Sequence, residues 1–145
     1  MRPSDLRYSE SHEWVKVSGK DATIGITDYA VSQLSDLVHI DLPKVGDSLE
    51  QGGSFGEIES VKTVAELLIP VGGKILEVHK EIAENLDVIV DDPFGEGWLI
   101  KVKLSNPSEV DSLMKSKEYA EFIKTSESAH GGGDDDENID EEDLL

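Results

Sequence analysis

The sequence predicts an all-β domain of sandwich or barrel type, and three observations support this. Seven short segments are rich in alternating apolar or β-branched residues. Each is bounded by Gly, Pro, Asn or Asp, and such closely spaced turns are typical of sandwiches and barrels. The chain has 145 residues, enough for one compact domain with a usable core but too few for two ordinary domains.

The predicted strands follow one another with little chain between them. A turn-rich stretch, KVGDSLEQGG at residues 44–53, separates the third strand from the fourth with two turn clusters. The seven strands are residues 12–17 (HEWVKV), 21–26 (DATIGI), 37–42 (LVHIDL), 54–60 (SFGEIES), 63–69 (TVAELLI), 74–79 (KILEVH) and 97–104 (GWLIKVKL).

Helices are predicted at only two places. Thr27 is a helix-capping candidate, and Ala30, Val31 and Leu34 follow it at helical spacing, which predicts one short helix early in the chain. Residues 106–124 (NPSEVDSLMKSKEYAEFIK) show a similar apolar spacing. We expect one or two helices there, and we expect Trp14 and Trp98 to fill the core.

The last twenty residues differ in composition from the rest. Residues 126–145 (SESAHGGGDDDENIDEEDLL) contain three glycines and a dense run of carboxylates with no basic residue. We expect one folded domain at residues 1–125 and a disordered acidic tail at 126–145. The tail could serve solubility or act as an electrostatic docking arm for a partner, and the sequence leaves both open.

Composition excludes several classes of function. Thirteen basic and 32 acidic residues give a net charge of −19, which disfavours nucleic acid and anionic membranes as partners. The absence of cysteine excludes disulfides, thiolate metal sites and a cysteine nucleophile. No stretch reads as an export or import leader or as a membrane helix, so we expect a soluble cytoplasmic protein. The histidines show neither metal-ligand spacing nor a nearby nucleophile, so neither a metal site nor a catalytic residue is predicted.

One lysine, Lys62, lies where the chain is expected to turn. The residues around it fit one stripe of a helix or one face of extended chain equally well. Pro70 and the pair Gly72–Gly73 leave little room for a helix, which favours two strands joined by a tight turn near Val61–Lys62. A hairpin tip projects Lys62 into solvent, where its flexible stem and modifiable amine suit a tether.

The order of motifs around this hairpin resembles that of the H-protein family of the glycine cleavage system. The similarity extends from about Arg7 to Lys124, and its most specific elements are SHEW, GITDYA, ESVK and GEGW. The segments that carry it are YSESHEWVKV, DATIGITDYAVSQLSDLVHIDLPKVGD, FGEIESVKTVAELLIPVGGKILEV, DDPFGEGWLIKV and LSNPSEVDSLMKSKEY.

The resemblance implies a β-sandwich of the hybrid-barrel lipoyl type and a carrier rather than an enzyme. Lipoate would be joined by an amide to Lys62, and the long flexible arm would visit several active sites. In this family glycine decarboxylase loads an aminomethyl group onto the arm, an aminomethyltransferase removes the carbon, and dihydrolipoyl dehydrogenase reoxidises the dithiol. A lipoate-attaching enzyme is also an implied partner.

The resemblance also implies a cleft that shelters the loaded arm. Its cargo carries a cationic amine, which needs charge-assisted hydrogen bonds if it is partly buried. Ser11, Glu13 and Glu66 stand at the positions where the family places such contacts, although Glu66 replaces the more usual aspartate. Glu13 could instead be a surface charge, and Glu66 could help a lipoylating enzyme recognise the hairpin.

Other functions stay open at this stage. Thr63 and Val64 replace the usual small alanines after the lysine, and related H-like carriers serve sulfur oxidation through an assembly that resembles heterodisulfide reductase. A further alternative is an interaction module in which Lys62 is never modified. A lipoyl domain of a 2-oxo-acid dehydrogenase is disfavoured because no catalytic domain follows, and a biotinyl domain because methionines do not flank Lys62.

Overall fold

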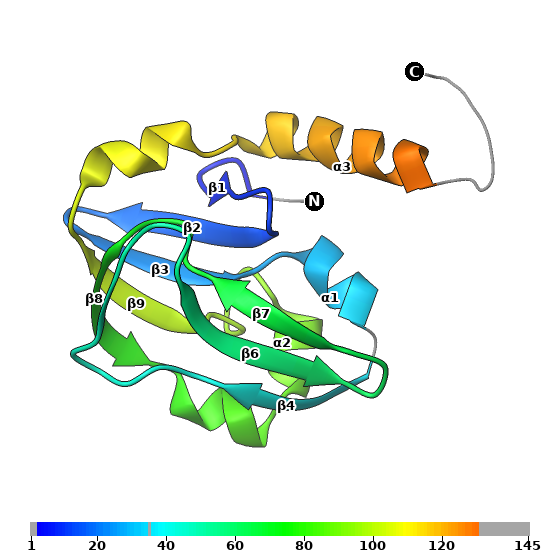
Figure 1. Ribbon diagram of the computed structural model, residues 1–145, viewed down its shortest axis with the longest axis horizontal. Coiled ribbons are helices and arrows are strands. Elements are labelled where there is room, and N and C mark those ends of the chain that lie inside the picture. Colours follow the sequence, from blue (N-terminus) through cyan, green and yellow to red (C-terminus); the bar gives the residue numbers. More distant parts are fainter. Residues whose placement is uncertain (1–2, 35, 131–145) are drawn as a thin grey trace.

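The computed structural model describes residues 3–34 and 36–130, and two β-sheets dominate it (Figure 1). The larger sheet has the strand order β1-β2-β3-β9-β8-β5, and the smaller has the order β4-β6-β7. The strands are β1 (Arg7–Tyr8), β2 (Glu13–Ser18), β3 (Asp21–Ile26), β4 (Leu37–Asp41), β5 (Ser48–Leu49), β6 (Ser54–Ser60), β7 (Val64–Leu68), β8 (Gly73–Val78) and β9 (Ile100–Leu104). The predicted all-β sandwich is confirmed.

Short helices connect and cover the sheets. The early helix forms as predicted, and the one or two helices predicted near the C-terminus appear as one 3₁₀ helix and one α-helix. Two further short helices, between β8 and β9, were not predicted. The helices are α1 (Asp28–Leu34), η1 (Lys80–Glu84), α2 (Asp87–Asp91), η2 (Pro107–Ser112) and α3 (Ser116–His130). Helix α3 extends five residues into the predicted tail, and the rest of that tail lies outside the described residues.

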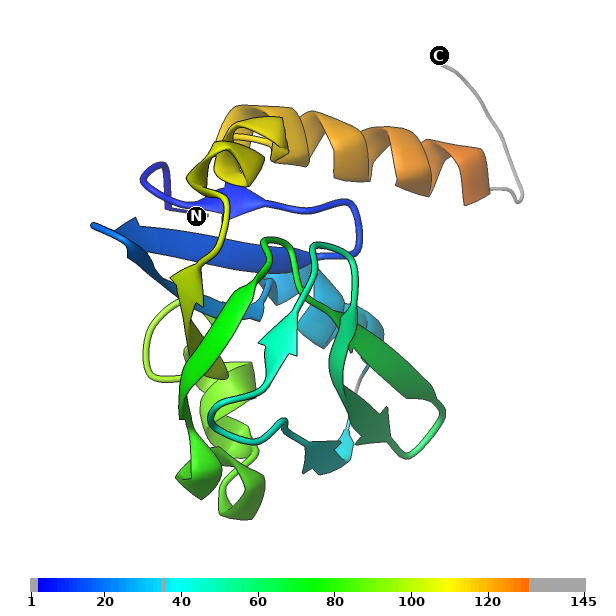
Figure 2. The same ribbon diagram turned by 60° about the vertical axis from the view of Figure 1, so that its left-hand side comes forward.

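Two apolar clusters hold the structure together. The larger cluster lies between the sheets and contains alternate residues of their inner faces, such as Ile24, Ile58 and Val102. The smaller cluster lies on the opposite side of β2, where α3 covers β1 and β2. Figure 2 shows the same helix running over these two strands. The smaller cluster consists of Leu6, Tyr8, Trp14, Tyr119 and Ile123.

The two tryptophans differ in burial. Trp14 is buried in the smaller cluster, and its indole N–H donates to the carbonyl of Pro93 at 2.8 Å. Trp98 is only partly buried. Its ring stacks on His79, and the Lys101 ammonium lies over the ring. The prediction that both fill the core is therefore right for Trp14 and wrong for Trp98.

Trp14 requires a glycine on the neighbouring strand. Gly25 is its cross-strand partner, and a Cβ atom at Gly25 would lie 2.7 Å from the indole ring. Nonbonded carbon atoms do not approach that closely in folded proteins, so any side chain at this position forces the indole out of place. The glycine therefore allows the smaller cluster to close over the sheet.

The first prediction concerns this contact. Gly25→Ala should lower the free energy of unfolding by about 1–3 kcal/mol, because the added methyl group overpacks the indole. Urea unfolding followed by far-UV circular dichroism measures the change. The same substitution in a Trp14→Phe background should cost less, since the smaller ring leaves room. Equal costs in the two backgrounds would contradict the proposed clash.

Candidate functional site

Lys62 lies at the tip of the hairpin formed by β6 and β7, as predicted. The hairpin is closed by a hydrogen bond from the amide of Ser60 to the carbonyl of Thr63 at 2.8 Å. The buried Ser60 hydroxyl also accepts from the amides of Lys62 and Thr63, at 3.3 and 3.2 Å. The backbone at the tip is therefore held firmly, while the Lys62 side chain stands in solvent.

The surroundings of Lys62 leave its amine accessible. The amide of Val61 donates to the carbonyl of Asp36 at 3.0 Å, which fixes the hairpin tip beside the start of β4. Val61 and Val64 expose 62% and 54% of their surface. Within residues 3–34 and 36–130, no ion pair involves Lys62. An exposed, unpaired amine on a rigid turn suits the covalent attachment of a long acyl group.

A hollow of about 280 Å³ lies along the hairpin, between the start of β2 and helix α1. One wall comes from the turn before β2, a second from α1, and a third from β6 and β7. It is lined by Ser11, His12, Glu13, Ile26, Tyr29, Ala30, Gln33, Leu34, Ile58, Ala65, Glu66 and Leu67. We call this hollow the arm cleft. It combines an apolar floor with carboxylate and hydroxyl groups at its edge.

Glu13 is the most deeply buried polar residue of the arm cleft, with 1% of its surface exposed. One carboxylate oxygen accepts from the hydroxyls of Ser9, at 2.9 Å, and Ser11. The other accepts from the amide of Leu68 in β7 at 3.2 Å. Glu13 thus joins the larger sheet to the hairpin strand that leads to Lys62.

Burial gives Glu13 an unusual protonation equilibrium. Loss of water raises the pKa of its carboxyl group to about 7, although the hydrogen bonds from Ser11, Ser9 and Leu68 oppose part of this rise. The residue is therefore close to half ionised near neutral pH. A cation that entered the arm cleft would favour the ionised form.

The structure brings the three residues singled out from the sequence to one place. Ser11, Glu13 and Glu66 all line the arm cleft, with Ser11 and Glu66 exposed at its edge. Sequence reasoning missed the wall from α1 (Tyr29, Ala30, Gln33 and Leu34) and the contribution of Ser9. The four wall residues have the spacing of one helical face, but nothing in the sequence showed which strand that face meets.

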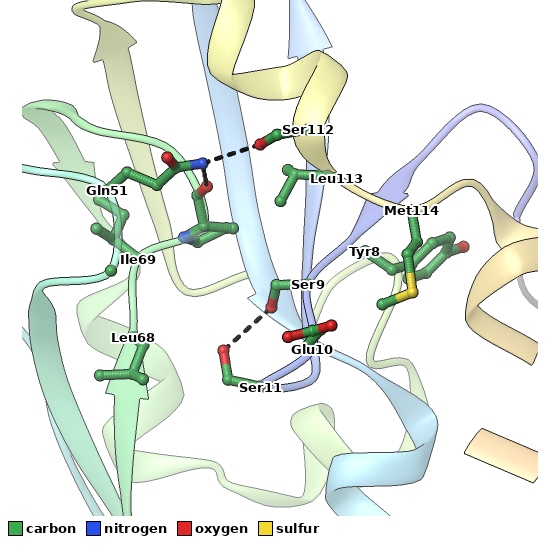
Figure 3. Close-up of a pocket in the computed structure, with 12 residues that line it drawn as sticks. Tyr8, Ser9, Glu10, Ser11, Gln51, Leu68, Ile69, Ser112, Leu113 and Met114 are labelled. Carbon is green, nitrogen blue, oxygen red and sulfur yellow. Dashed lines mark hydrogen bonds between the residues drawn. The ribbon is translucent and has the colours of Figure 1, made fainter. Parts of the chain in front are cut away.

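A second, larger hollow lies beyond the hydrogen bond between Glu13 and Leu68. Its volume is about 420 Å³, and it shares Ser11 with the arm cleft (Figure 3). The Gln51 amide crosses it and donates to the carbonyl of Pro70 at 3.0 Å and to the hydroxyl of Ser112 at 3.3 Å. This hollow lies farther from Lys62 along β7 than the arm cleft does.

The outer face of the smaller sheet is strongly acidic. Asp41, Glu57 and Glu66 are cross-strand neighbours in one row, and all three are exposed. Glu59 lies in the next row beside His39, whose imidazole is 2.8 Å from Asp41. Like charges directly opposite one another destabilise a sheet, so these carboxylates lower the stability of the smaller sheet.

Other kinds of site receive no support from the described part of the chain. Residues 3–34 and 36–130 contain no group of three or more His, Cys, Asp or Glu side chains that could hold a metal ion. No helix in the same residues is long and apolar enough to cross a membrane.

Comparison with known proteins connects this geometry to one family. The family model of the glycine cleavage H-protein matches residues 6–126. The glycine cleavage system H protein of Carboxydothermus hydrogenoformans is 47% identical over 122 residues, which cover 84% of this chain and 94% of the relative. The mitochondrial H protein 2 of Arabidopsis thaliana is 45% identical over 126 residues, covering 87% and 81% respectively.

A solved structure agrees with the sequence comparison. The crystal structure of the glycine cleavage system H protein from Mycobacterium marinum superposes with a TM-score of 0.79 at 36% identity, covering 85% of this chain and 99% of that chain. None of these relatives is named for sulfur oxidation. The chain belongs to the glycine cleavage H-protein family and is a non-catalytic lipoyl carrier of the glycine cleavage system.

Proposed function

We propose that Lys62 is the residue that carries lipoate, through an amide to its side-chain amine. The observation that carries this proposal is the exposed Lys62 on a turn whose backbone is held by the Ser60 hydroxyl. The rigid turn fixes where the arm begins, and the lysine stem leaves its direction free. Bound lipoate would supply a disulfide that takes up the aminomethyl group together with two electrons, and the dithiol left when the group is removed would give those electrons up on reoxidation.

The arm cleft is within reach of such an arm. The lysine and lipoyl stems together contain about ten single bonds, and at ~1.5 Å a bond an extended arm spans on the order of 14 Å. Strand β7 rises by ~3.3 Å a residue, so Glu66 and Leu67 lie roughly 13–17 Å along the chain from Lys62. An arm folded back along β7 would therefore reach the part of the arm cleft that Ala65 and Glu66 line.

We assign Ser11, Glu13 and Glu66 to the recognition of the cationic amine carried by the arm. A partly buried ammonium requires charge-assisted hydrogen bonds, which carboxylates and a hydroxyl supply. Glu13 suits this role because the pKa of its carboxyl group, about 7, lets both the protonated and the ionised forms be populated near neutral pH. The arriving amine would favour the ionised carboxylate, and the pairing would replace the water that the amine leaves behind.

The proposal includes the finer assignments of partner, location and domain. The specific partners are glycine decarboxylase, an aminomethyltransferase, dihydrolipoyl dehydrogenase and a lipoate-attaching enzyme, and the location is the cytoplasm. Residues 1–125 would form the carrier domain and residues 126–145 an acidic tail. The family match over residues 6–126 supports this division.

The second prediction tests the attachment site. Lys62→Arg keeps the charge but removes the acylatable amine, so lipoylation and glycine-dependent exchange of labelled bicarbonate by glycine decarboxylase should both be lost. Intact-mass spectrometry and the exchange assay measure the two effects. Lys44→Arg, at an exposed lysine in the turn before β5, is the matched control and should behave as wild type. A lipoyl mass increment on Lys62→Arg would refute the assignment.

The third prediction concerns pH and stability. The unfolded chain loses the Glu13 proton near its ordinary pKa of 4.5, whereas the folded chain keeps it until about pH 7. Unfolding therefore releases a proton between these values, and a rise in pH through this window lowers the free energy of unfolding. Relative to Glu13→Gln, the wild type should lose up to about 3 kcal/mol between about pH 5 and about pH 8.

Urea unfolding of the unlipoylated protein across this pH range measures the difference. Glu84→Gln, at an exposed glutamate of η1 outside the arm cleft, is the matched control, and its curve should run parallel to that of the wild type. Wild-type and Glu13→Gln curves that run parallel would show that Glu13 does not hold a proton in the folded state.

A further inference from the structure

The hydroxyl of Tyr119 connects three distant parts of the chain. Tyr119 lies in the first half of α3 and is fully buried. Its oxygen is 2.8 Å from Nδ1 of His12 and 2.6 Å from Oγ1 of Thr27. Both residues belong to segments that form the walls of the arm cleft. One phenol group therefore contacts two walls without itself lining the cleft.

The first wall depends on an uncommon backbone conformation at His12. Its φ of 74° lies in the left-handed region, which non-glycine residues seldom adopt. The amide of His12 donates to the carbonyl of Ser9 at 3.1 Å, and its carbonyl accepts from the amide of Thr27 at 3.0 Å. This turn directs the His12 ring toward Tyr119 and places Glu13, the next residue, in the arm cleft.

The second wall depends on Thr27. Its hydroxyl accepts from the amide of Ala30 at 3.2 Å, and its carbonyl accepts from the amide of Val31 at 3.1 Å. Thr27 therefore caps the N-terminus of α1. Ala30 and its neighbours in α1 form the wall opposite the hairpin, so the position of Thr27 sets the position of that wall.

The protons of this network can be assigned consistently. The amide of Ala30 donates to Thr27 Oγ1, which leaves the Thr27 hydroxyl proton for Tyr119. The Tyr119 hydroxyl can then donate to Nδ1 of His12 in the tautomer that leaves this nitrogen without a proton. The phenol is thus donor on one side and acceptor on the other, a combination that phenylalanine cannot provide.

We propose that Tyr119 is a positioning residue for the arm cleft. Its hydroxyl holds the His12–Glu13 turn and the start of α1 at a fixed separation, so that Glu13 faces the amine of the docked arm. The role rests on the proposed function of the cleft, and Tyr119 acts through Glu13 and α1 rather than by touching the cargo. Helix α3 thereby becomes part of the apparatus that retains the cargo.

The ring and the hydroxyl of Tyr119 have separable effects. The ring stacks on Tyr8 with a centroid distance of 4.8 Å and packs in the smaller apolar cluster. Tyr119→Phe keeps this packing and removes only the hydroxyl. Tyr8→Phe is a matched control, because it keeps the same ring stack and removes a hydroxyl that donates to the carbonyl of Pro3.

The fourth prediction uses the lipoylated full chain loaded by glycine decarboxylase with glycine labelled at its methylene carbon. Loss of the labelled methylene signal from the protein, followed by NMR without tetrahydrofolate, reports how well the cleft retains its cargo. Tyr119→Phe and Thr27→Val should each lose the label at least about fivefold faster than wild type, because each removes two hydrogen bonds and the loss of one corresponds to about that factor. Thr27→Ser, which keeps the hydroxyl, and Tyr8→Phe should stay close to the wild-type rate.

The outcomes separate this inference from the proposed function. If Tyr119→Phe loses the label at the wild-type rate, its hydroxyl does not position the arm cleft. If Tyr8→Phe accelerates the loss equally, the effect comes from weaker packing of the smaller apolar cluster, and the positioning role is again overturned. Wild-type protein that loses the label as fast when folded as when unfolded in urea would show that the cleft retains nothing. That result would refute the cleft itself and the role of Tyr119 together.

Discussion

The buried carboxyl group of Glu13 is the contact on which the site depends. It lies where the larger sheet approaches the hairpin strand β7, and it links the two through Ser9, Ser11 and Leu68. Burying this group costs free energy whenever it is charged, and the raised pKa expresses that cost. A fold selected for stability alone would place an apolar residue there. The cationic amine that we propose to dock in the arm cleft would offset that cost.

The rest of the site divides into a rigid frame and one free side chain. Ser60 locks the hairpin tip from inside, Trp14 packs against Gly25 on the neighbouring strand, and Thr27 caps the helix that walls the cleft. The Lys62 side chain extends away from this frame into solvent. A carrier needs both properties, because its arm must travel while its resting place keeps its shape.

Much of this arrangement could be predicted from the sequence, and particular residues show where prediction stops. Alternation in segments such as residues 74–79 identified the strands, and Pro70 with Gly72 placed the turn at Lys62. The helices η1 and α2 were missed because each has only five residues, too few for a 3.6-residue period to appear. The link from Tyr119 to Thr27 spans 92 positions, and no local pattern encodes such a contact.

Aromatic residues also show the limit of composition as a guide to burial. Trp14 is buried in the smaller cluster with Tyr119 and Ile123 of α3, whereas Trp98 packs against the same cluster only partly buried and stacks on His79. Whether an aromatic residue on the outer face of a sheet is buried depends on which distant segment crosses it. The long-range arrangement of the chain decides that outcome, and a single sequence does not display it.

The row of Asp41, Glu57 and Glu66 has a consequence for how this carrier meets other proteins. Three neighbouring carboxylates make the electrostatic potential negative on one face of the smaller sheet. This potential extends about one Debye length into solution, roughly 8 Å at physiological salt. A partner with a basic entrance would be turned by this field before contact, so that the hairpin arrives first. The acidic face would then set the rate of productive association, and dissolved salt would lower that rate for every partner that depends on this field.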